Sequence, residues 1–275
     1  MTSASASPGS TNVPAAPRPV VLDRVSFLVA GAQKGGTSAL DDYLRDHPEL
    51  CLATKKEISS LSQKEVHFFD TDGYFAVKPV DYAPYHARFE PRPPQRLLGE
   101  ATPSYMYWPT AAERIAQYNP AMKLIMVLRN PITRAFSHWN MVRRARAEPL
   151  PFLEAIRAEP ERRRNLKPWM MRRYSYIARG FYAQQLKRLW RYFPVEQTLI
   201  SKSEQLLAEP NEVLGRIAAF LDIAPFPSVA PRILGARKYE TTISDEEKRY
   251  LVGVYEDEIR ELERLLDWDC SAWLA

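Results

Sequence analysis

The fold of this chain can be predicted from one segment, FLVAGAQKGGTSALDDYL, which runs from Phe27 to Leu44. The apolar run VSFLVAG at 25–31 has no helical period and predicts a buried strand that ends at Gly31. Apolar residues then recur at helical spacing over 40–44, and His47-Pro48 is expected to close that helix. A glycine-rich loop between a strand and a helix N-terminus offers free backbone N–H groups, so this loop is a candidate phosphate-binding site.

The lysine of this loop is misplaced for a nucleoside triphosphatase. That motif is G-x-x-x-x-G-K-[ST], with the lysine directly before the hydroxyl residue. Counting from Gly31, Thr37 stands where the lysine should be, and the lysine of the loop is Lys34. A second apolar run, KLIMVL, ends in Arg129, where a triphosphatase usually has an aspartate for Mg²⁺. The two motifs together predict a nucleotide held without a metal ion.

The rest of the chain alternates strand-like and helix-like segments. We expect strands at 123–128 and 198–201 and helices at 111–120 and 174–192, a helix begun by Asn130-Pro131, and a helix begun by the capping box Ser244–Glu247; Thr110–Glu113 is a second candidate capping box. This alternation predicts an α/β fold with a P-loop-type parallel sheet, helices on both of its faces and a single domain.

Composition limits the classes of protein to which the chain can belong. The Ser-, Ala- and Pro-rich segment 1–22 is expected to be a disordered tail before a domain at 23–275. No secretory signal and no bilayer-length apolar run is present, and two isolated cysteines suit a reducing compartment, so we expect a cytoplasmic protein without a membrane anchor. The net charge of +5 is concentrated in 129–191, but this basic segment lacks a recognisable nucleic-acid-binding module.

A second anchor for an anionic ligand follows the second strand. Arg129 stands at the strand end and Ser137 about two turns into the next helix. The carboxyl ends of neighbouring parallel strands lie together, so both side chains are expected to face the ligand of the first loop. Alone, Ser137 would be read as an ordinary helix-surface serine. Two phosphate sites without a metal ion indicate 3′-phosphoadenosine 5′-phosphosulfate (PAPS).

Five segments then resemble the PAPS-dependent sulfotransferases, in particular the branch of the heparan sulfate sulfotransferases and their bacterial relatives. They are AGAQKGGTSAL, KEVHFFD, GEATPSY, LIMVLRNPITRAFSHW and RGFYAQQLKRLWRYFP, and the resemblance covers nearly all of 23–275. It implies that a loop of five residues holds the 5′-phosphosulfate: Lys34, Gly35, Gly36, Thr37 and Ser38. It also implies that Arg129 and Ser137 hold the 3′-phosphate, with PAP (3′-phosphoadenosine 5′-phosphate) as the product and no metal.

The segment KEVHFFD carries the candidate base. Glu65 and His67 occupy alternate positions, so an extended backbone would point both side chains the same way. The resemblance assigns the general base to Glu65, and His67 is a second base or a group that orients Glu65. The alternatives are a surface carboxylate paired with Lys64 and a packing histidine.

Two features depart from the pattern of that family. Ala101 stands where the family often has a lysine, as E-K-[ST]-P. The late basic loop is only loosely matched by GARKY, in which Arg237 and Lys238 are candidate donor contacts or part of a solvated turn. A polar insertion at 55–63 is either a lid or a plain surface insertion.

Two other functions stay open from the sequence: a P-loop ATP-dependent kinase, and a non-catalytic anion-binding relative that uses its basic face. The acceptor would be a hydroxyl, or less readily an amine, of a small molecule, a lipid or a glycan. An aromatic wall or ordinary core packing would account equally for Tyr105, Tyr107, Trp108 and Trp169, and core packing is favoured for Trp139. Neither the acceptor nor the oligomeric state follows from these patterns.

Overall fold

The computed structural model describes residues 22–54, 56–58, 61–63, 65–165, 167–232, 239 and 241–275, without the side chains of 56–58, 61–63, 168 and 169. Nearly all of the expected tail at 1–22 lies outside these residues. So do Lys64, Arg237 and Lys238, and Trp169 lacks a described side chain. Among the described residues no helix is both long and apolar enough to cross a membrane.

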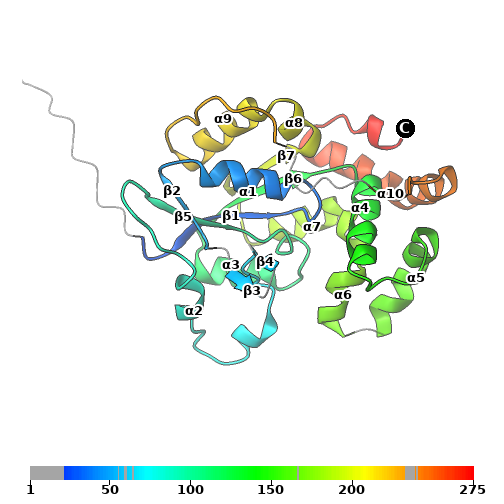
Figure 1. The fold of residues 1–275 in the computed structure, drawn as a ribbon, viewed down its shortest axis with the longest axis horizontal. Helices are drawn as coiled ribbons and strands as arrows, with labels where there is room; N and C mark the ends of the chain where they lie inside the picture. The colour runs from blue at the N-terminus through cyan, green and yellow to red at the C-terminus, as the bar shows by residue number, and fades with distance from the viewer. Residues whose placement is uncertain are drawn as a thin grey trace, which may run out of the picture.

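A five-stranded parallel sheet forms the centre of the molecule, in the order β2-β5-β1-β6-β7 (Figure 1). The strands are β1 (Val25–Gly31), β2 (Leu50–Leu52), β5 (Leu97–Ala101), β6 (Lys123–Leu128) and β7 (Thr198–Lys202). The predicted α/β fold is therefore confirmed. Three of the strands follow the expected apolar runs, whereas β2 and β5 were not expected, since β2 is short and LLGEA carries a glycine and a glutamate.

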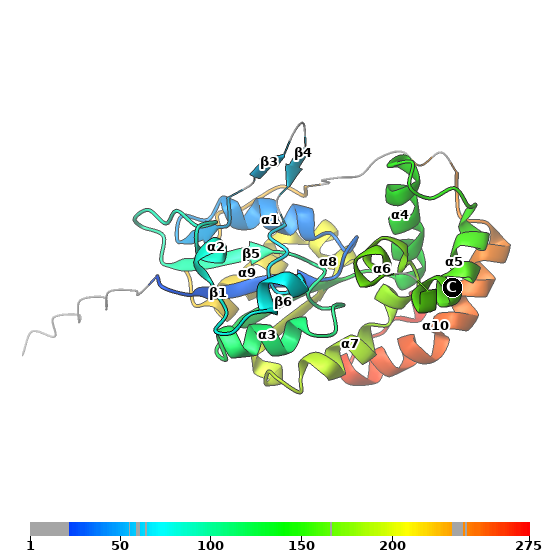
Figure 2. The same ribbon diagram turned by 90° about the horizontal axis from the view of Figure 1, so that it is seen from below.

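Helices cover both faces of the sheet, because alternate strand residues enter two separate apolar clusters. Phe27 and Val29 of β1 pack with α1 (Thr37–Arg45), α8 (Ser203–Ala208) and α9 (Pro210–Leu221). Leu28 and Ala30 face the cluster that includes α3 (Ala111–Tyr118), α4 (Pro131–Arg144), α7 (Tyr182–Leu189) and α10 (Asp245–Leu266). In Figure 2, α1 lies on one side of β1, and α3, α7 and α10 lie on the other.

The remaining elements lie outside these layers. Within the insertion at 55–63, β3 (Lys56–Ile58) and β4 (Leu61–Gln63) pair antiparallel and project from the body in Figure 2. The others are α2 (Ala83–His86), α5 (Phe152–Asn165), α6 (Pro168–Tyr174) and the 3₁₀ turns η1 (Asp72–Phe75), η2 (Ala178–Gly180), η3 (Val195–Gln197) and η4 (Ser271–Trp273).

Two of the three predicted helix starts have the expected caps. Asn130 accepts a hydrogen bond from the Ile132 backbone N–H at 2.9 Å, with Pro131 in the first helical position. Ser244 and Glu247 form the reciprocal capping box of α10. The capping box expected at Thr110 is wrong: Thr110 is the residue before α3, but its backbone is already helical and its side chain makes no cap hydrogen bond.

The single helix expected over 174–192 is also wrong. Helix α6 ends at Tyr174, the turn η2 follows, and α7 begins only at Tyr182. The carboxylate of Glu159 accepts hydrogen bonds from the backbone N–H groups of Ile177 and Ala178, at 2.5 and 2.8 Å. These N–H groups are therefore taken by a side chain from another helix, which holds the chain in a turn where the apolar spacing alone favoured a helix.

The loop after β1 is fixed by close packing against β6. The Ala32 backbone N–H donates to the Val127 carbonyl at 3.0 Å, and a Cβ at Gly35 would lie 2.2 Å from the same carbonyl oxygen. We expect Gly35→Ala to destabilise the protein by about 1–3 kcal/mol, because the backbone of β6 or of the loop must move.

Gly215, an exposed helical glycine of α9, is the matched control, because a Cβ there meets nothing within 4 Å. Gly215→Ala should stabilise the protein by about 0.5–1 kcal/mol. Urea denaturation of both variants measures the two changes. An equal gain in stability for both alanines would contradict the tight packing of the loop on Val127.

Candidate active site

A cavity of about 800 Å³ opens at the carboxyl end of the sheet. Its wall contains loop residues that follow β1 (Gln33, Lys34, Gly36, Thr37, Ser38), Pro103 after β5, Arg129 and Asn130 after β6, and Ser203 and Glu204 after β7. Glu65 and Ser137 also line it. The structure thus brings most of the predicted site residues together around one volume. Gly35 does not line it, and its role is the packing on Val127.

Lys34 projects into this cavity from a strained position. Its φ of 70° lies in the left-handed region, which costs a non-glycine residue about 1–2 kcal/mol. Burial and the positive charges of Arg144, Arg129 and Arg134 together lower the pKa of Lys34 to about 8, while Glu65 opposes them. The lysine is therefore surrounded by more positive than negative charge, an environment that binding of an anion would relieve.

The second predicted anchor is also assembled. The Arg129 Nε donates to Thr133 Oγ1 at 3.0 Å, which orients the guanidinium at the cavity wall. Ser137 is buried, and its Oγ accepts a hydrogen bond of 2.9 Å from the hydroxyl of Tyr239. The Ser137 side chain is thus turned toward the cavity and not toward solvent, and Tyr239 joins the same wall.

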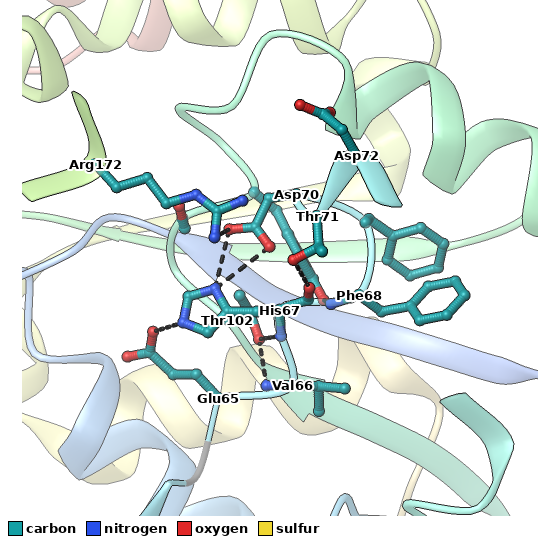
Figure 3. A network of polar contacts seen from close by, with 12 residues as sticks. Glu65, Val66, His67, Phe68, Asp70, Thr71, Asp72, Thr102 and Arg172 are labelled. Atoms are coloured by element: carbon teal, nitrogen blue, oxygen red, sulfur yellow. Dashed lines mark hydrogen bonds and ion pairs between the residues drawn. The ribbon is translucent and has the colours of Figure 1, made fainter. Parts of the chain in front are cut away.

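Glu65 and His67 meet, but not through an extended backbone. His67 has a φ of 54°, in the left-handed region, and the segment is not a strand. The His67 Nε2 lies 3.0 Å from Glu65 Oε2, and its Nδ1 lies 3.0 Å from Asp70 Oδ2 (Figure 3). The Arg172 Nη1 lies 3.7 Å from the same Asp70 oxygen. His67 therefore contacts Glu65 as a group that orients it would, although the backbone between them is not extended.

The two carboxylates set the charge of the imidazole between them. Burial alone would lower the pKa of His67, but the hydrogen bonds and charges of Asp70 and Glu65 raise it to about 9. Burial would likewise raise the pKa of the fully buried Asp70, but His67, Arg172 and a hydrogen bond from Ser104 together hold it below its usual value. His67 is therefore a protonated donor to both carboxylates at neutral pH, and Glu65 is the member of this group that reaches the cavity wall.

Residues at the end of β5 hold the backbone of the segment 65–67 through hydrogen bonds. Thr102 Oγ1 accepts hydrogen bonds from the backbone N–H groups of Val66 and His67, at 3.0 and 3.4 Å, and donates to Glu100 Oε2 at 2.6 Å. Glu100 is fully buried and also accepts from the hydroxyls of Tyr105 and Tyr85. Burial raises the pKa of Glu100 to about 7 against these hydrogen bonds. GEATPSY thus positions the backbone of the Glu65 segment.

The other residues singled out from the sequence lie in different surroundings. Ala101 is buried in the apolar cluster beside α1, so it adds no charge to the cavity. Tyr105, Trp108 and Trp139 are core residues, whereas Tyr107 lines a second cavity of about 220 Å³. Arg162, in the basic segment, pairs with Glu148 at 2.5 Å. Arg237 and Lys238 lie outside the described residues.

Several residues of the site had no recognised signal in the sequence. Asp70 and Thr102 stand in the quoted motifs KEVHFFD and GEATPSY but were given no role there, Arg172 reaches Asp70 from α6, and Ala272 and Trp273 line the large cavity from the C-terminal turn η4. Ser203 and Glu204 could have been found, because they directly follow the predicted strand 198–201 and so stand at the carboxyl edge of the sheet.

The residues present fit an anionic nucleotide. The N-terminus of α1 stands at the cavity wall, where Gly36, Thr37 and Ser38 place the positive end of the helix dipole. In the parts of the chain that the structure describes, no three His, Cys, Asp or Glu side chains gather into a group that could hold a metal ion. Lys34 and Arg129 are the basic residues from the two predicted anchors that reach the cavity.

Comparison with known proteins gives a consistent result. The sulfotransferase domain model matches residues 24–250. The chain is 33% identical over 220 residues to human heparan sulfate glucosamine 3-O-sulfotransferase 6, and 28% identical over 201 residues to mouse heparan sulfate glucosamine 3-O-sulfotransferase 5. These alignments cover 78% and 72% of the chain but 57% and 53% of those proteins, so the chain spans little more than half of their length.

A solved structure also matches the fold. The crystal structure of a sulfotransferase from Alicyclobacillus acidocaldarius has a TM-score of 0.75 and 29% sequence identity, covering 92% of this chain and 100% of that one. The family resemblance inferred from the five sequence motifs is confirmed by these matches.

The contacts of His67 generate a titration prediction. Because its folded pKa of about 9 exceeds the ordinary value of 6.5, its contribution to stability is fully present below about pH 6.5 and is lost as the pH rises through about 9. NMR titration of labelled histidine should show the His67 ring protonated at pH 7.5, with His67→Asn identifying its signals. Asp70→Asn should lower this pKa. An unshifted His67 that titrates near 6.5 would contradict the arrangement of Figure 3.

Proposed function

The chain belongs to the sulfotransferase domain family, and on that premise we propose that it transfers a sulfuryl group from PAPS to an acceptor hydroxyl or, less readily, an amine. The observation that carries the proposal is that Lys34, Arg129 and Glu65 line one cavity of about 800 Å³. Two cations at separate strand ends suit a donor with two phosphate groups, and the carboxylate suits removal of a proton from the acceptor.

The donor would be held at its two ends. The N–H groups of the loop before α1 and the ammonium of Lys34 would hold the 5′-phosphosulfate, with Gly36, Thr37 and Ser38 at the same wall. Arg129 and Ser137 would hold the 3′-phosphate, which ATP lacks. Such binding needs no divalent metal, because the opposing charge comes from side chains and from the helix N-terminus.

The reaction would be an in-line displacement at sulfur. A bond forms between the acceptor oxygen and sulfur as the bond from sulfur to the 5′-phosphate oxygen breaks, and the electron pair of that bond leaves with PAP. Glu65 would take the proton of the acceptor hydroxyl as general base. His67, Asp70 and Thr102 would act as positioning residues, because they hold the carboxylate and its backbone in place. Lys34 would stabilise the charge that develops on the departing phosphate.

A carbohydrate acceptor has support from the second cavity. This cavity of about 220 Å³ is lined by two aromatic rings (Tyr107, Phe181), two amides (Gln184, Gln185) and two arginines (Arg163, Arg188), with Ala178. Aromatic faces with planar hydrogen-bonding groups suit a sugar ring, and the arginines suit an acidic substituent. The relatives named as heparan sulfate sulfotransferases are in keeping with this choice, while a lipid or a small molecule stays a candidate.

Transfer from ³⁵S-labelled PAPS to a panel of desulfated glycans, sterols and phenols, without added metal, tests the proposal. We expect at least one acceptor to gain label. Glu65→Gln should then lower kcat by about 10²–10⁴-fold, the usual contribution of a positioned base, while the affinity for PAP changes little.

Glu196→Gln is the matched control, because this glutamate is exposed and lies at the turn before β7, away from the cavity. It should leave both transfer and PAP affinity unchanged. Wild-type rates in Glu65→Gln would remove Glu65 as the base, and PAP binding without any labelled product across a broad panel would favour a non-catalytic relative.

A further inference from the structure

A buried arginine beside the proposed site lacks partners for most of its hydrogen-bond donors. Arg179, in the turn η2, is 3% exposed. Its Nε and Nη1 have no hydrogen-bond partner among the described residues. Its Nη2 makes only two long contacts, 3.5 Å to Ser104 Oγ and 3.4 Å to the Arg172 carbonyl. A guanidinium has five N–H donors, so this group is prepared for more acceptors than the protein supplies.

The positive charge of Arg179, like its N–H donors, lacks a close partner among the described residues. Among the described residues no carboxylate forms an ion pair with it, and burial lowers the pKa of Arg179 to about 10. The groups that face it are Tyr107, Asp70 and Glu65, which favour the cation, and Arg134, which opposes it. A buried cation without a close anion is costly, and such groups persist chiefly where a ligand completes them.

The surrounding structure nevertheless holds the guanidinium in one place. It stacks on the ring of Tyr107 at 4.4 Å, and the Tyr107 hydroxyl donates to Ser175 Oγ at 2.8 Å. The Gln185 Nε2 donates to the Arg179 carbonyl at 3.2 Å. A Cβ at Gly180 would lie 2.5 Å from the Tyr255 hydroxyl, so the next residue cannot shift freely. The position of Arg179 is thus fixed by its packed neighbours and does not result from loose packing.

Arg179 itself lines neither cavity, but residues beside it or next to its contacts line both. Its stacking partner Tyr107 and its neighbour Ala178 line the smaller cavity. Its contact Ser104 directly follows Pro103, which lines the larger cavity with Lys34 and Glu65. Ser104 also hydrogen-bonds to Asp70, the carboxylate that holds His67. The unpartnered donors are therefore buried behind the two walls, close to both the acceptor side and the donor side.

We propose that Arg179 is a further catalytic residue, which donates hydrogen bonds to the oxygens of the sulfuryl group during its transfer. This inference rests on the proposed function. Lys34 would stabilise the negative charge on the departing phosphate. From the acceptor side, Arg179 would stabilise the negative charge on the oxygens of the sulfuryl group.

Inorganic sulfate tests this assignment without knowledge of the acceptor. Protein saturated with PAP has both phosphate sites filled, so sulfate can report on the position of the sulfuryl group. Calorimetric titration with sodium sulfate, against sodium chloride at equal ionic strength, should show saturable binding to wild type. Arg179→Met should weaken it by about 10-fold to 100-fold, the value of a charged hydrogen bond, and Arg179→Lys should retain part of it.

The affinity for PAP and the melting temperature separate this role from a structural one. Arg179→Met should keep the PAP affinity of wild type. The substitution removes a buried charge that has no ion-pair partner among the described residues, so it should not lower the melting temperature. Arg157→Met, at an exposed arginine paired with Glu246, is the control for net charge and should bind sulfate normally. Equal sulfate binding in wild type and Arg179→Met, or none in wild type with PAP bound, would overturn the assignment. Failure of PAP itself to bind would instead refute the proposed function.

Discussion

The site depends on the contact between the loop after β1 and the carbonyl of Val127. That carbonyl accepts a hydrogen bond from Ala32 and leaves room for no side chain at Gly35. The contact fixes the loop against β6 only two residues before Arg129. The two predicted phosphate anchors are therefore spaced by backbone packing, and not by the reach of flexible side chains. The strained φ of Lys34 and the left-handed start of α1 at Gly36 belong to the same tight turn.

Charge around the cavity is arranged in two opposed groups. Burial, and after it the positive charges of neighbouring arginines that include Arg129 and Arg134, lowers the pKa of Lys34. Facing them, Glu65 and Asp70 share a protonated His67. An anionic donor would satisfy the first group, and an acceptor proton would go to the second. Hydrogen bonds orient Arg129 in the first group and His67 in the second, so these side chains are in place before any ligand binds.

The sequence predicted the parts of the site that are local. The loop 31–38, the strand that ends at Arg129 and the capped start of α4 depend on neighbouring residues and on the rule that parallel strands end at one edge. The rest depends on contacts between distant segments. Thr102 holds the backbone of Val66, Asp70 pairs with Arg172, and Arg179 is buried with N–H donors that lack partners among the described residues. No periodic pattern in the sequence indicates these contacts. The helix predicted over 174–192 failed for the same reason, because the carboxylate that breaks it belongs to Glu159 on α5.

If two phosphate sites that need no metal define this cavity, the affinities of PAP and ATP for the protein should differ in a way that calorimetry can measure. Calorimetry of PAP and of ATP, each with and without Mg²⁺, should show PAP binding tightly, unaffected by the metal and much more tightly than ATP. Arg129→Ala should remove most of that preference, because the 3′-phosphate distinguishes the two ligands, while Arg191→Ala, at an exposed arginine, should not. Equal or tighter binding of Mg-ATP would mean that the loop is a variant triphosphate site and would contradict the proposed sulfuryl transfer.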